Sequence, residues 1–342
     1  MNRAAAILLA GSLIAGDAPP ATPTVNATAD EAIERGLKGL KNLQTSRTGH
    51  IGSEGAGITA MAGMAFLAGG HTPTRGAYRE VVAKALSAVI ADQDKATGYL
   101  GGNGSGNMYS HGFATLFLAE CYGLAPEMPV RRALEAAIDL IWKSQNNQGG
   151  WRYSPAPVDA DLSVTICQVM ALRAAYNAGI GGQRSIEVMA KAIEYVKKSH
   201  NGNGTFSYTL PAGGGGSGEG EVPRAAAGVM SLIGAGITNP TDPALGPGLR
   251  FLRSNALAHL RSTAGWGHYW YGQYYVAQAM FHSPDESDWD RYWKAAVPAI
   301  VSKQSKSSGL WTESGGGGPA FASGVALVIL QIPNNYLPIF QR

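Results

Sequence analysis

The sequence has few of the residues that build metal centres, disulfide frameworks or charged binding surfaces. Its 342 residues include 2 cysteines, and charged residues make up only 15% of the chain. Two cysteines exclude a cysteine-rich metal site, and because Cys121 and Cys167 both fall inside apolar segments we expect two buried free thiols. A net charge of +3 from scattered lysines and arginines argues against a nucleic-acid partner.

Long hydrophobic runs are also missing, because no apolar run reaches the roughly 18 residues of a membrane span. The N-terminus, MNRAAAILLAGSLIAGDAPP, has one basic residue, a short apolar run and small residues near Ala15 to Ala18. This layout is typical of a secretory signal peptide, so we expect residues 1–18 to be removed and the protein to be exported, to the periplasm or the cell exterior. A frayed apolar tail is the alternative. Residues 19–29 form a Pro/Thr-rich linker in this interpretation, and residues 30–342 form one domain.

The rest of the chain alternates two kinds of helical segment. The first kind is amphipathic: Ile33, Leu37 and Leu40 share one side of the first such segment, whereas Arg35 and Lys38 take the other. The second kind carries almost no charge, and a helix that is apolar all round must be buried. The uncharged segments are GITAMAGMAFLAG, SHGFATLFLAECYG, DLSVTICQVMALRAAYNAG, VPRAAAGVMSLIGAG, GHYWYGQYYVAQAMF and PAFASGVALVILQ.

Pairs of these segments recur every 45 to 60 residues or so, roughly the spacing of a helical repeat. One pair cannot bury both faces of its uncharged helix, so neighbouring pairs must stack. The first and last uncharged segments have no polar capping face, which favours a closed ring over an open solenoid. We therefore predict an all-α fold, a single α/α toroid of six helical hairpins, or (α/α)6 barrel, around a central cavity.

Glutamines end four of the amphipathic segments, at Gln44, Gln93, Gln145 and Gln304. Three of them are followed closely by a glycine and an aromatic residue. A glutamine at a helix end can bond free backbone groups in the adjacent turn, the glycine allows the reversal, and the aromatic ring packs over it. We interpret this pattern as structural. The three sets are Gln93 with Gly98 and Tyr99, Gln145 with Gly149 and Trp151, and Gln304 with Gly309 and Trp311.

The stretches 145–151 and 304–311 resemble the QW repeat of squalene-hopene and oxidosqualene cyclases, which protein prenyltransferase β subunits share in weaker form. Longer segments are similar to exported prenyltransferase/squalene-cyclase-repeat proteins of planctomycete-type bacteria. The resemblance implies an α/α toroid and says little about activity. The segments that carry it are NMYSHGFATLFLAECYGL, GGWRYSP, DADLSVTICQVMALRAA, HYWYGQYYVAQAM and LQIPNNYLPIFQR.

Asp159 and Asp161 are the candidates for catalysis. Class II terpene cyclases carry Asp-x-Asp-Asp, whose middle acid protonates an alkene or epoxide, so the resemblance implies Asp161 as the acid and Asp159 as its partner. A protonating carboxyl group needs a raised pKa, which burial can supply. However, Leu162 stands where the motif has its last aspartate. Those cyclases also close their active site between two toroid domains, and this chain is long enough for one. Capping of the following helix by either aspartate is the structural alternative.

A zinc prenyltransferase is a further alternative, since those enzymes hold Zn²⁺ with an aspartate, a cysteine and a histidine. Asp161 and Cys167 do not have the matching spacing, and no histidine follows in a recognisable context. We therefore expect no metal and no other cofactor.

Several aromatic and polar residues near the starts of the uncharged segments are candidates for contact with a ligand in the cavity. Aromatic faces can line a pocket for an isoprenoid or a ring-bearing molecule, although rings at helical spacing also occur in cores. Arg224 is unusual as a charge in an uncharged segment, and Asp161 is a candidate partner for it. The ligand-binding candidates are Tyr109, His111, Arg224, His268, Trp270, Tyr271 and Tyr275.

The sequence thus predicts an exported toroid that binds an apolar, isoprenoid-like or ring-bearing ligand, or a protein partner, without turnover. An active isoprenoid enzyme, which uses Asp161 as the acid or transfers a prenyl group, is the alternative. Carbohydrate processing is less favoured, because no second pair of carboxylates stands at a suitable spacing.

Overall fold

The structure is a computed structural model that describes residues 26–52, 55–102, 107–211, 220–262, 268–312 and 317–341. Within these ranges the chain forms twelve α-helices and two short 3-10 helices, and its β-contacts are isolated bridges. The predicted signal peptide, residues 1–18, lies outside the described residues. Of the predicted linker, residues 26–29 are described, and the first helix already begins at Ala27 with Asn26 as its N-cap.

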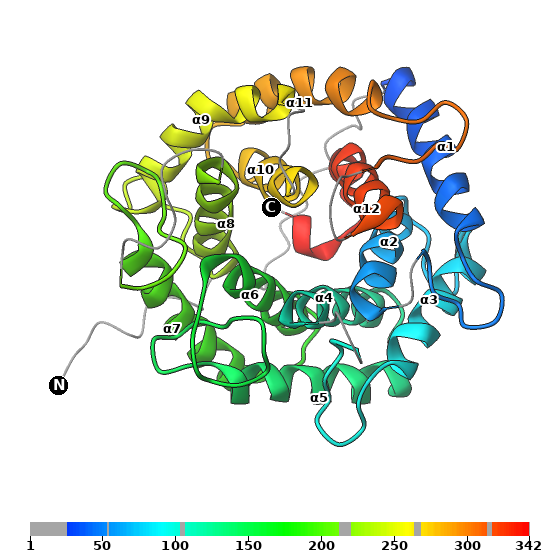
Figure 1. Cartoon of the computed structure of the whole chain (residues 1–342), viewed down its shortest axis with the longest axis horizontal. Helices are drawn as coiled ribbons and strands as arrows, with labels where there is room; N and C mark the ends of the chain where they lie inside the picture. The colour runs from blue at the N-terminus through cyan, green and yellow to red at the C-terminus, as the bar shows by residue number, and fades with distance from the viewer. Residues whose placement is uncertain are drawn as a thin grey trace.

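The helices form two concentric rings (Figure 1). Charged faces point outward from the outer helices, whereas nearly every residue of the inner helices is buried. The outer helices are α1 (Ala27–Asn42), α3 (Arg79–Ala91), α5 (Met128–Ser144), α7 (Gly182–Ser199), α9 (Leu245–Arg261) and α11 (Glu286–Val301). The inner helices are α2 (Ala56–Ala68), α4 (Met108–Leu124), α6 (Leu162–Asn177), α8 (Glu221–Gly234), α10 (Tyr269–Phe281) and α12 (Gly318–Gln331).

The ring closes on itself, because α12 packs against α2 and α1 packs against α11 and α12. This confirms the predicted α/α toroid of six hairpins. No helix in the described part of the chain is both long and apolar enough to cross a bilayer.

The glutamines at the ends of the outer helices tie each hairpin to the next. The Nε2 group of Gln145 donates to the Gly149 carbonyl at 2.8 Å and to the Val188 carbonyl of α7 at 2.9 Å. Gln304 does the same across the seam of the ring, where its Nε2 group donates at 2.8 Å to the carbonyl of Ala32 in α1. The predicted bond to the adjacent turn is confirmed, and the second bond to the following outer helix explains why the residue is a glutamine, which has two amide protons to donate.

The residue after each turn is buried beneath it. Trp151 and Trp311 are 1% and 0% exposed, and the indole N–H of each donates to a carbonyl of the preceding outer helix. Leu100, rather than the predicted Tyr99, takes this place in the second turn: Leu100 is fully buried, whereas Tyr99 is partly exposed. The prediction named Tyr99, one residue too early, because it required an aromatic residue at this place.

All six inner helices run in the same direction, since an outer helix returns the chain between each pair. Their N-termini therefore meet at one end of the ring, which we call the mouth, and their C-termini at the other, which we call the base. The C-terminal segment, with η1 (Ile332–Asn334) and η2 (Pro338–Phe340), packs against α4 and α6. It ends near the centre of the ring in projection (Figure 1).

Candidate active site and ligand-binding mouth

Asp161 is the N-cap of α6. Its Oδ1 atom accepts hydrogen bonds from the Val164 backbone N–H at 2.9 Å and from the Ser163 hydroxyl at 2.6 Å. The side chain is 0% exposed. The capping role considered from the sequence is therefore what the structure shows, and the carboxylate itself does not reach the surface of the mouth.

Arg152 holds the other side of this carboxylate. Its Nε atom lies 3.5 Å from Asp161 Oδ2, and its Nη1 atom lies 2.8 Å from Asp159 Oδ2. Arg224, the partner considered from the sequence, instead donates through Nε to the Phe206 carbonyl at 3.1 Å. Burial raises the pKa of Asp161, against the opposing effects of its hydrogen bonds and of Arg152. Asp159 is half exposed and pairs with the guanidinium at the surface.

Ser163 was missed by the sequence analysis, although it links Asp161 to the mouth. Its hydroxyl donates to Asp161 and is also hydrogen-bonded to the Tyr109 hydroxyl. Its backbone carbonyl accepts a bond from the Tyr271 hydroxyl at 2.7 Å. Ser163, Tyr109 and Tyr271 are all partly exposed, so the groups that face the mouth are hydroxyls and aromatic rings rather than the carboxylate. The signal available was the position of Ser163 two residues after the cap, where a hydroxyl can bond back to the capping carboxylate.

Aromatic rings meet across the lumen below the mouth. Helix α4 packs between α2 and α6, and α10 packs between α8 and α12, so α4 and α10 face each other across the ring. Tyr109 and Tyr271 have ring centroids 5.9 Å apart, and Phe113 and Tyr274 have centroids 6.1 Å apart. Among the described residues, these contacts bridge the lumen between α4 and α10 at this level.

More tyrosines surround this contact. Tyr153 lies 6.0 Å from Tyr109 between ring centroids, and its hydroxyl bonds that of Tyr208 at 2.5 Å. Tyr275, predicted as a ligand contact, is only 1% exposed, and its hydroxyl lies 3.3 Å from Cys167 Sγ. Tyr275 therefore supports Tyr271 from behind, with ring centroids 5.0 Å apart.

His111 is part of the hairpin framework and not of the mouth. It is 0% exposed, its Nδ1 atom accepts from the Leu100 N–H at 3.1 Å, and its Nε2 atom lies 3.1 Å from the Ala137 carbonyl. Thr165 occupies the equivalent place in the next hairpin, where its hydroxyl accepts from the Trp151 N–H. Burial lowers the pKa of His111 to about 4, so the ring is neutral at pH 7 and donates through Nε2. The prediction of a ligand contact is corrected accordingly.

Trp270 is also turned away from the other candidates. It is 2% exposed, and its indole N–H donates to the Thr312 carbonyl at 3.1 Å. Residue Thr312 precedes α12, so this ring packs against the connection from α11 rather than lining the lumen. His268 is exposed immediately before α10. Trp270 and Tyr271 were both predicted as ligand contacts, and of the two only Tyr271 is partly exposed.

The described residues contain no group of three or more histidine, cysteine, aspartate or glutamate side chains arranged to hold a metal. Cys121 and Cys167 are both free and buried, as predicted. Burial raises the pKa of the Cys167 thiol to about 12, so it stays protonated at neutral pH. Neither cysteine offers a reactive thiolate.

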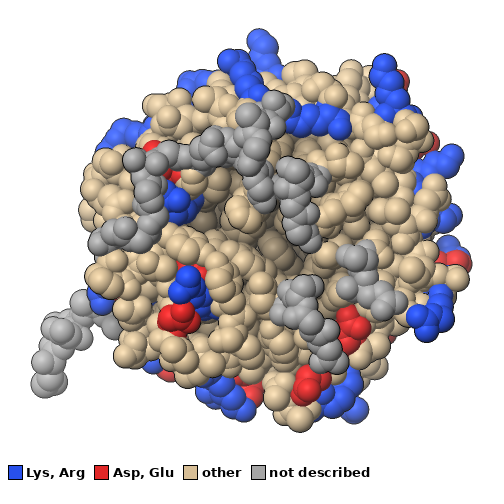
Figure 2. All heavy atoms as spheres, in the orientation of Figure 1, with Lys and Arg blue, Asp and Glu red and all other residues tan. Residues whose placement is uncertain are grey.

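The mouth is the hollowed face of the molecule. Figure 2 shows this face with a depression at its centre, and most of the charged side chains on the face lie toward its edge. Among the described residues, few charged side chains border the depression.

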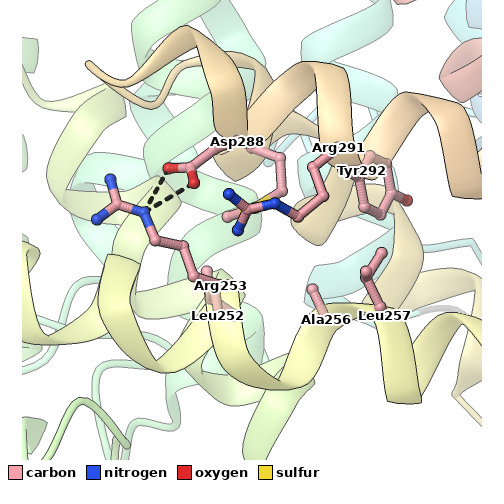
Figure 3. A pocket seen from close by; sticks show the side chains of 8 residues that line it. Leu252, Arg253, Ala256, Leu257, Asp288, Arg291 and Tyr292 are labelled. Carbon is pink, nitrogen blue, oxygen red and sulfur yellow. Dashed lines mark hydrogen bonds and ion pairs between the residues drawn. The ribbon is translucent and has the colours of Figure 1, made fainter.

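A second recess lies in the outer wall between α9 and α11 (Figure 3). Its volume is about 10 Å³, enough for one water molecule at most. Arg253 of α9 reaches across it, with Nε 2.7 Å from both carboxylate oxygens of Asp288 in α11. This recess is a structural contact between two outer helices.

No family model and no curated protein matches this sequence. Solved structures do match. The type II terpene cyclase MstE from Scytonema is similar over 91% of this chain and 100% of its own, with a TM-score of 0.62 at 13% identity. The cellobiose 2-epimerase from Spirochaeta thermophila DSM 6192 covers 92% of this chain and 99% of its own, with a TM-score of 0.68 at 13% identity.

The GH76A α-1,6-mannanase from Salegentibacter sp. HEL1_6 has a TM-score of 0.68 at 9% identity, over 90% of this chain and 99% of its own. A terpene cyclase, a sugar epimerase and a mannanase thus share the architecture of this chain. Their sequence identities to it, 9–13%, show a common fold and not a common reaction. The chain has the α/α-toroid fold of these three proteins.

Proposed function

We propose that this protein binds an apolar, isoprenoid-like or ring-bearing ligand at the mouth of the toroid, without chemical turnover. The observation that carries the proposal is the state of Asp161. The only carboxylate at the position of the cyclase acid is a helix cap with 0% exposure, separated from the mouth by Ser163 and Tyr109. A general acid must come within hydrogen-bond reach of the atom it protonates, whereas the Asp161 carboxylate is directed at the start of its own helix.

Tyrosines supply the recognition surface in this proposal. Tyr109, Tyr153, Tyr208 and Tyr271 come from two inner helices and two loops, and each is at least partly exposed. A tyrosine ring offers an apolar face to an unsaturated chain or a ring, while its hydroxyl gives an orienting hydrogen bond. The ring contacts between them fix the shape of the surface before a ligand arrives, which reduces the entropy lost on binding.

The alternative, an isoprenoid enzyme of the cyclase or prenyltransferase type, has one observation in its favour. Tyr109, Ser163 and Asp161 form a continuous chain of hydrogen bonds from the mouth to a buried carboxyl group. Burial raises the pKa of that carboxyl group, as a proton donor requires. In this version Asp161 is the acid, and its proton reaches the substrate in one relay through the Ser163 and Tyr109 hydroxyls, which leaves Asp161 as the carboxylate.

The proposal also includes export of the protein and its membership of a family. The N-terminal pattern supports secretion to the periplasm or beyond, and the QW-type turns support a place among the exported prenyltransferase/squalene-cyclase-repeat proteins. Expression of the full chain in a Gram-negative host, followed by fractionation and N-terminal sequencing, tests the first point. A mature N-terminus within residues 15–19 in the periplasmic fraction is the expected result, and an intact protein in the cytoplasm contradicts it.

Turnover is tested with squalene, farnesyl diphosphate and cellobiose, each incubated with the wild-type protein and with an Asp161→Asn variant. Asparagine is an equally good N-cap, so the variant keeps the start of α6 and isolates the acid function. We expect no product from either protein. A compound that binds should quench the intrinsic fluorescence of the wild type and of the variant to the same extent. A product formed by the wild type and lost in the variant establishes the enzyme alternative and overturns the proposal.

A further inference from the structure

A separate pocket lies at the base of the toroid, where the first and last helices close the ring. Its volume is about 300 Å³. It is bounded by the outer helix α1, by the turn that follows α2 and by the end of α12. Since the mouth lies at the N-termini of the inner helices and this pocket at the C-termini of two of them, the two sites are at opposite ends of the ring.

Two carboxylates stand over this pocket. Asp30 and Glu34 are four residues apart on α1, so their side chains share one face, and both line the pocket. In the described part of the chain, neither has a cationic side chain within 4 Å, and no lysine or arginine lines the pocket. The nearby Arg35 is turned away, because it pairs with Glu31 at 3.7 Å and donates to Gln304 Oε1 at 2.9 Å.

The floor of the pocket adds hydrogen-bond acceptors. Helix α2 is capped by Gly69 and helix α12 ends at Gln331, so the pocket lies at the negative ends of two helix dipoles. Gln331 is 2% exposed, and its amide N–H groups both donate inward, to the carbonyls of Ala65 and Leu327 at 2.9 Å. Its Oε1 atom is thereby left as an acceptor on the pocket side, near Gly69.

The side wall is apolar and rigid. Ile33 and Leu37 of α1 line it, together with the ring of Tyr78. The Tyr78 ring is held by Phe66 and His71, with centroid distances of 5.1 and 5.0 Å. Burial lowers the pKa of His71, so this ring is neutral at pH 7 and brings no positive charge to the pocket.

We propose that this pocket binds an organic cation, a primary ammonium or guanidinium group on an apolar stem. The cation bonds Asp30, Glu34 and Gln331 Oε1, and the stem lies along Tyr78 and Leu37. Two carboxylates, two helix C-termini and a buried amide oxygen all favour a donor with positive charge. Both a free amine and the lysine or arginine side chain of a peptide have this chemistry.

Saturation-transfer NMR on the full chain tests the proposal with three probes: butylammonium, N-acetyl-lysine-N-methylamide and 1-butanol. The cations bind through the charged head, so we expect signals from the first two and none from the alcohol. Preference for the blocked lysine identifies a peptide side chain as the natural occupant, whereas preference for butylammonium identifies a free amine. Either preference supports the site.

An Asp30→Asn/Glu34→Gln double variant keeps the shape of the pocket and removes its charge. We expect the affinity for the cations to fall about tenfold, as loss of two solvent-exposed charge contacts implies. Glu31→Gln is the matched control, since Glu31 lies on the same turn of α1 but points away and pairs with Arg35. Equal binding by the double variant, binding of 1-butanol at the same strength, or no binding of either cation at millimolar concentration would overturn the proposal.

Discussion

Tyr109 and Tyr271 lie edge to face across the lumen of the toroid, with ring centroids 5.9 Å apart and planes inclined at 82°. Both hydroxyls meet at Ser163, one at its side chain and the other at its backbone carbonyl. The pair comes from opposite inner helices and is fixed by a third, so it forms a rigid floor to the mouth. In the proposed function, a ligand bound at the mouth would rest on these two rings.

Removal of one ring therefore changes binding at the mouth. Tyr271→Ala should weaken the affinity for an apolar probe such as farnesol by about tenfold, because a buried aromatic contact is lost. Tyr271→Phe keeps the ring and loses only the hydroxyl, so its effect on an apolar probe should be smaller. Titration of intrinsic fluorescence measures both.

Tyr336→Ala is the control for this series, since Tyr336 is 51% exposed in the C-terminal segment beyond α12. It should bind farnesol as the wild type does. If Tyr271→Ala also binds with unchanged affinity, the mouth is not the ligand site.

Gln145 and Gln304, the glutamines that tie one outer helix to the next, should each stabilise the fold through two hydrogen bonds. Gln145→Ala leaves the buried carbonyls of Gly149 and Val188 without this donor, so we expect the free energy of unfolding to fall by about 1–3 kcal/mol. Gln304→Ala breaks the corresponding link between α11 and α1 and should cost a similar amount.

Urea unfolding followed by circular dichroism measures these changes. Gln183→Ala is a suitable control, because Gln183 is exposed on α7 and bonds only to a neighbouring side chain, Glu187. If Gln183→Ala lowers the free energy of unfolding as much as Gln145→Ala does, the hydrogen bonds of Gln145 between hairpins do not stabilise the fold.

The fold was predictable from the sequence because its determinants are local and repeat. The apolar stripe of α1 and the uncharged run of α12 each specify burial without reference to the rest of the chain. Gln145 and Gln304 could be recognised because a glutamine at a helix end has few backbone partners other than the adjacent turn. The second bond of each glutamine, to the next outer helix, depends on the distance between hairpins and could not be read from spacing.

The candidate site was less predictable because it depends on the direction of single side chains. Trp270 and Tyr271 are adjacent, and only the rotation of α10 decides which one lines the mouth. Arg152 reaches Asp161 because the loop between α5 and α6 folds back on itself, as the bridge between Trp151 and Asp161 shows. His111 looked like a ligand contact, since the sequence does not reveal that it occupies the position of Thr165 in the next hairpin.

His111 should make the protein sensitive to acid. Burial lowers its pKa to about 4 from the ordinary histidine value of 6.5, so between these values the unfolded chain binds a proton that the folded chain does not. The stability contributed by the neutral ring is complete above pH 6.5 and is lost as the pH falls to 4, at up to about 1.4 kcal/mol per pH unit.

A His111→Gln variant lacks this titration. The difference in unfolding free energy between the wild type and the variant should therefore shrink as the pH is lowered from 7 to 4. Other histidines with lowered pKa values, such as His259, contribute equally to both proteins and cancel in the difference. A difference that is constant over this range would show that His111 is not neutral and buried.

Glu120 should have the opposite dependence. It lies in α4 with 2% exposure, near the Ile339 backbone of the C-terminal segment, and its Oε2 atom has no hydrogen-bond partner among the described residues. Burial raises its pKa to about 8 from the ordinary glutamate value of 4.5. Between those values the folded protein holds a proton that the unfolded chain releases, so the contribution to stability is complete below pH 4.5 and is lost as the pH rises to 8.

Glutamine has the shape of the protonated side chain and cannot ionise, so Glu120→Gln should be more stable than the wild type at pH 8. Its advantage should grow with pH from 5 to 8 by up to about 1.4 kcal/mol per unit, which chemical unfolding at a series of pH values measures. Glu194→Gln, on the exposed face of α7, is the control and should show no such growth. If the advantage of Glu120→Gln does not grow with pH, the carboxyl group is ionised in the folded protein, and the C-terminal segment must admit water to the base of the toroid.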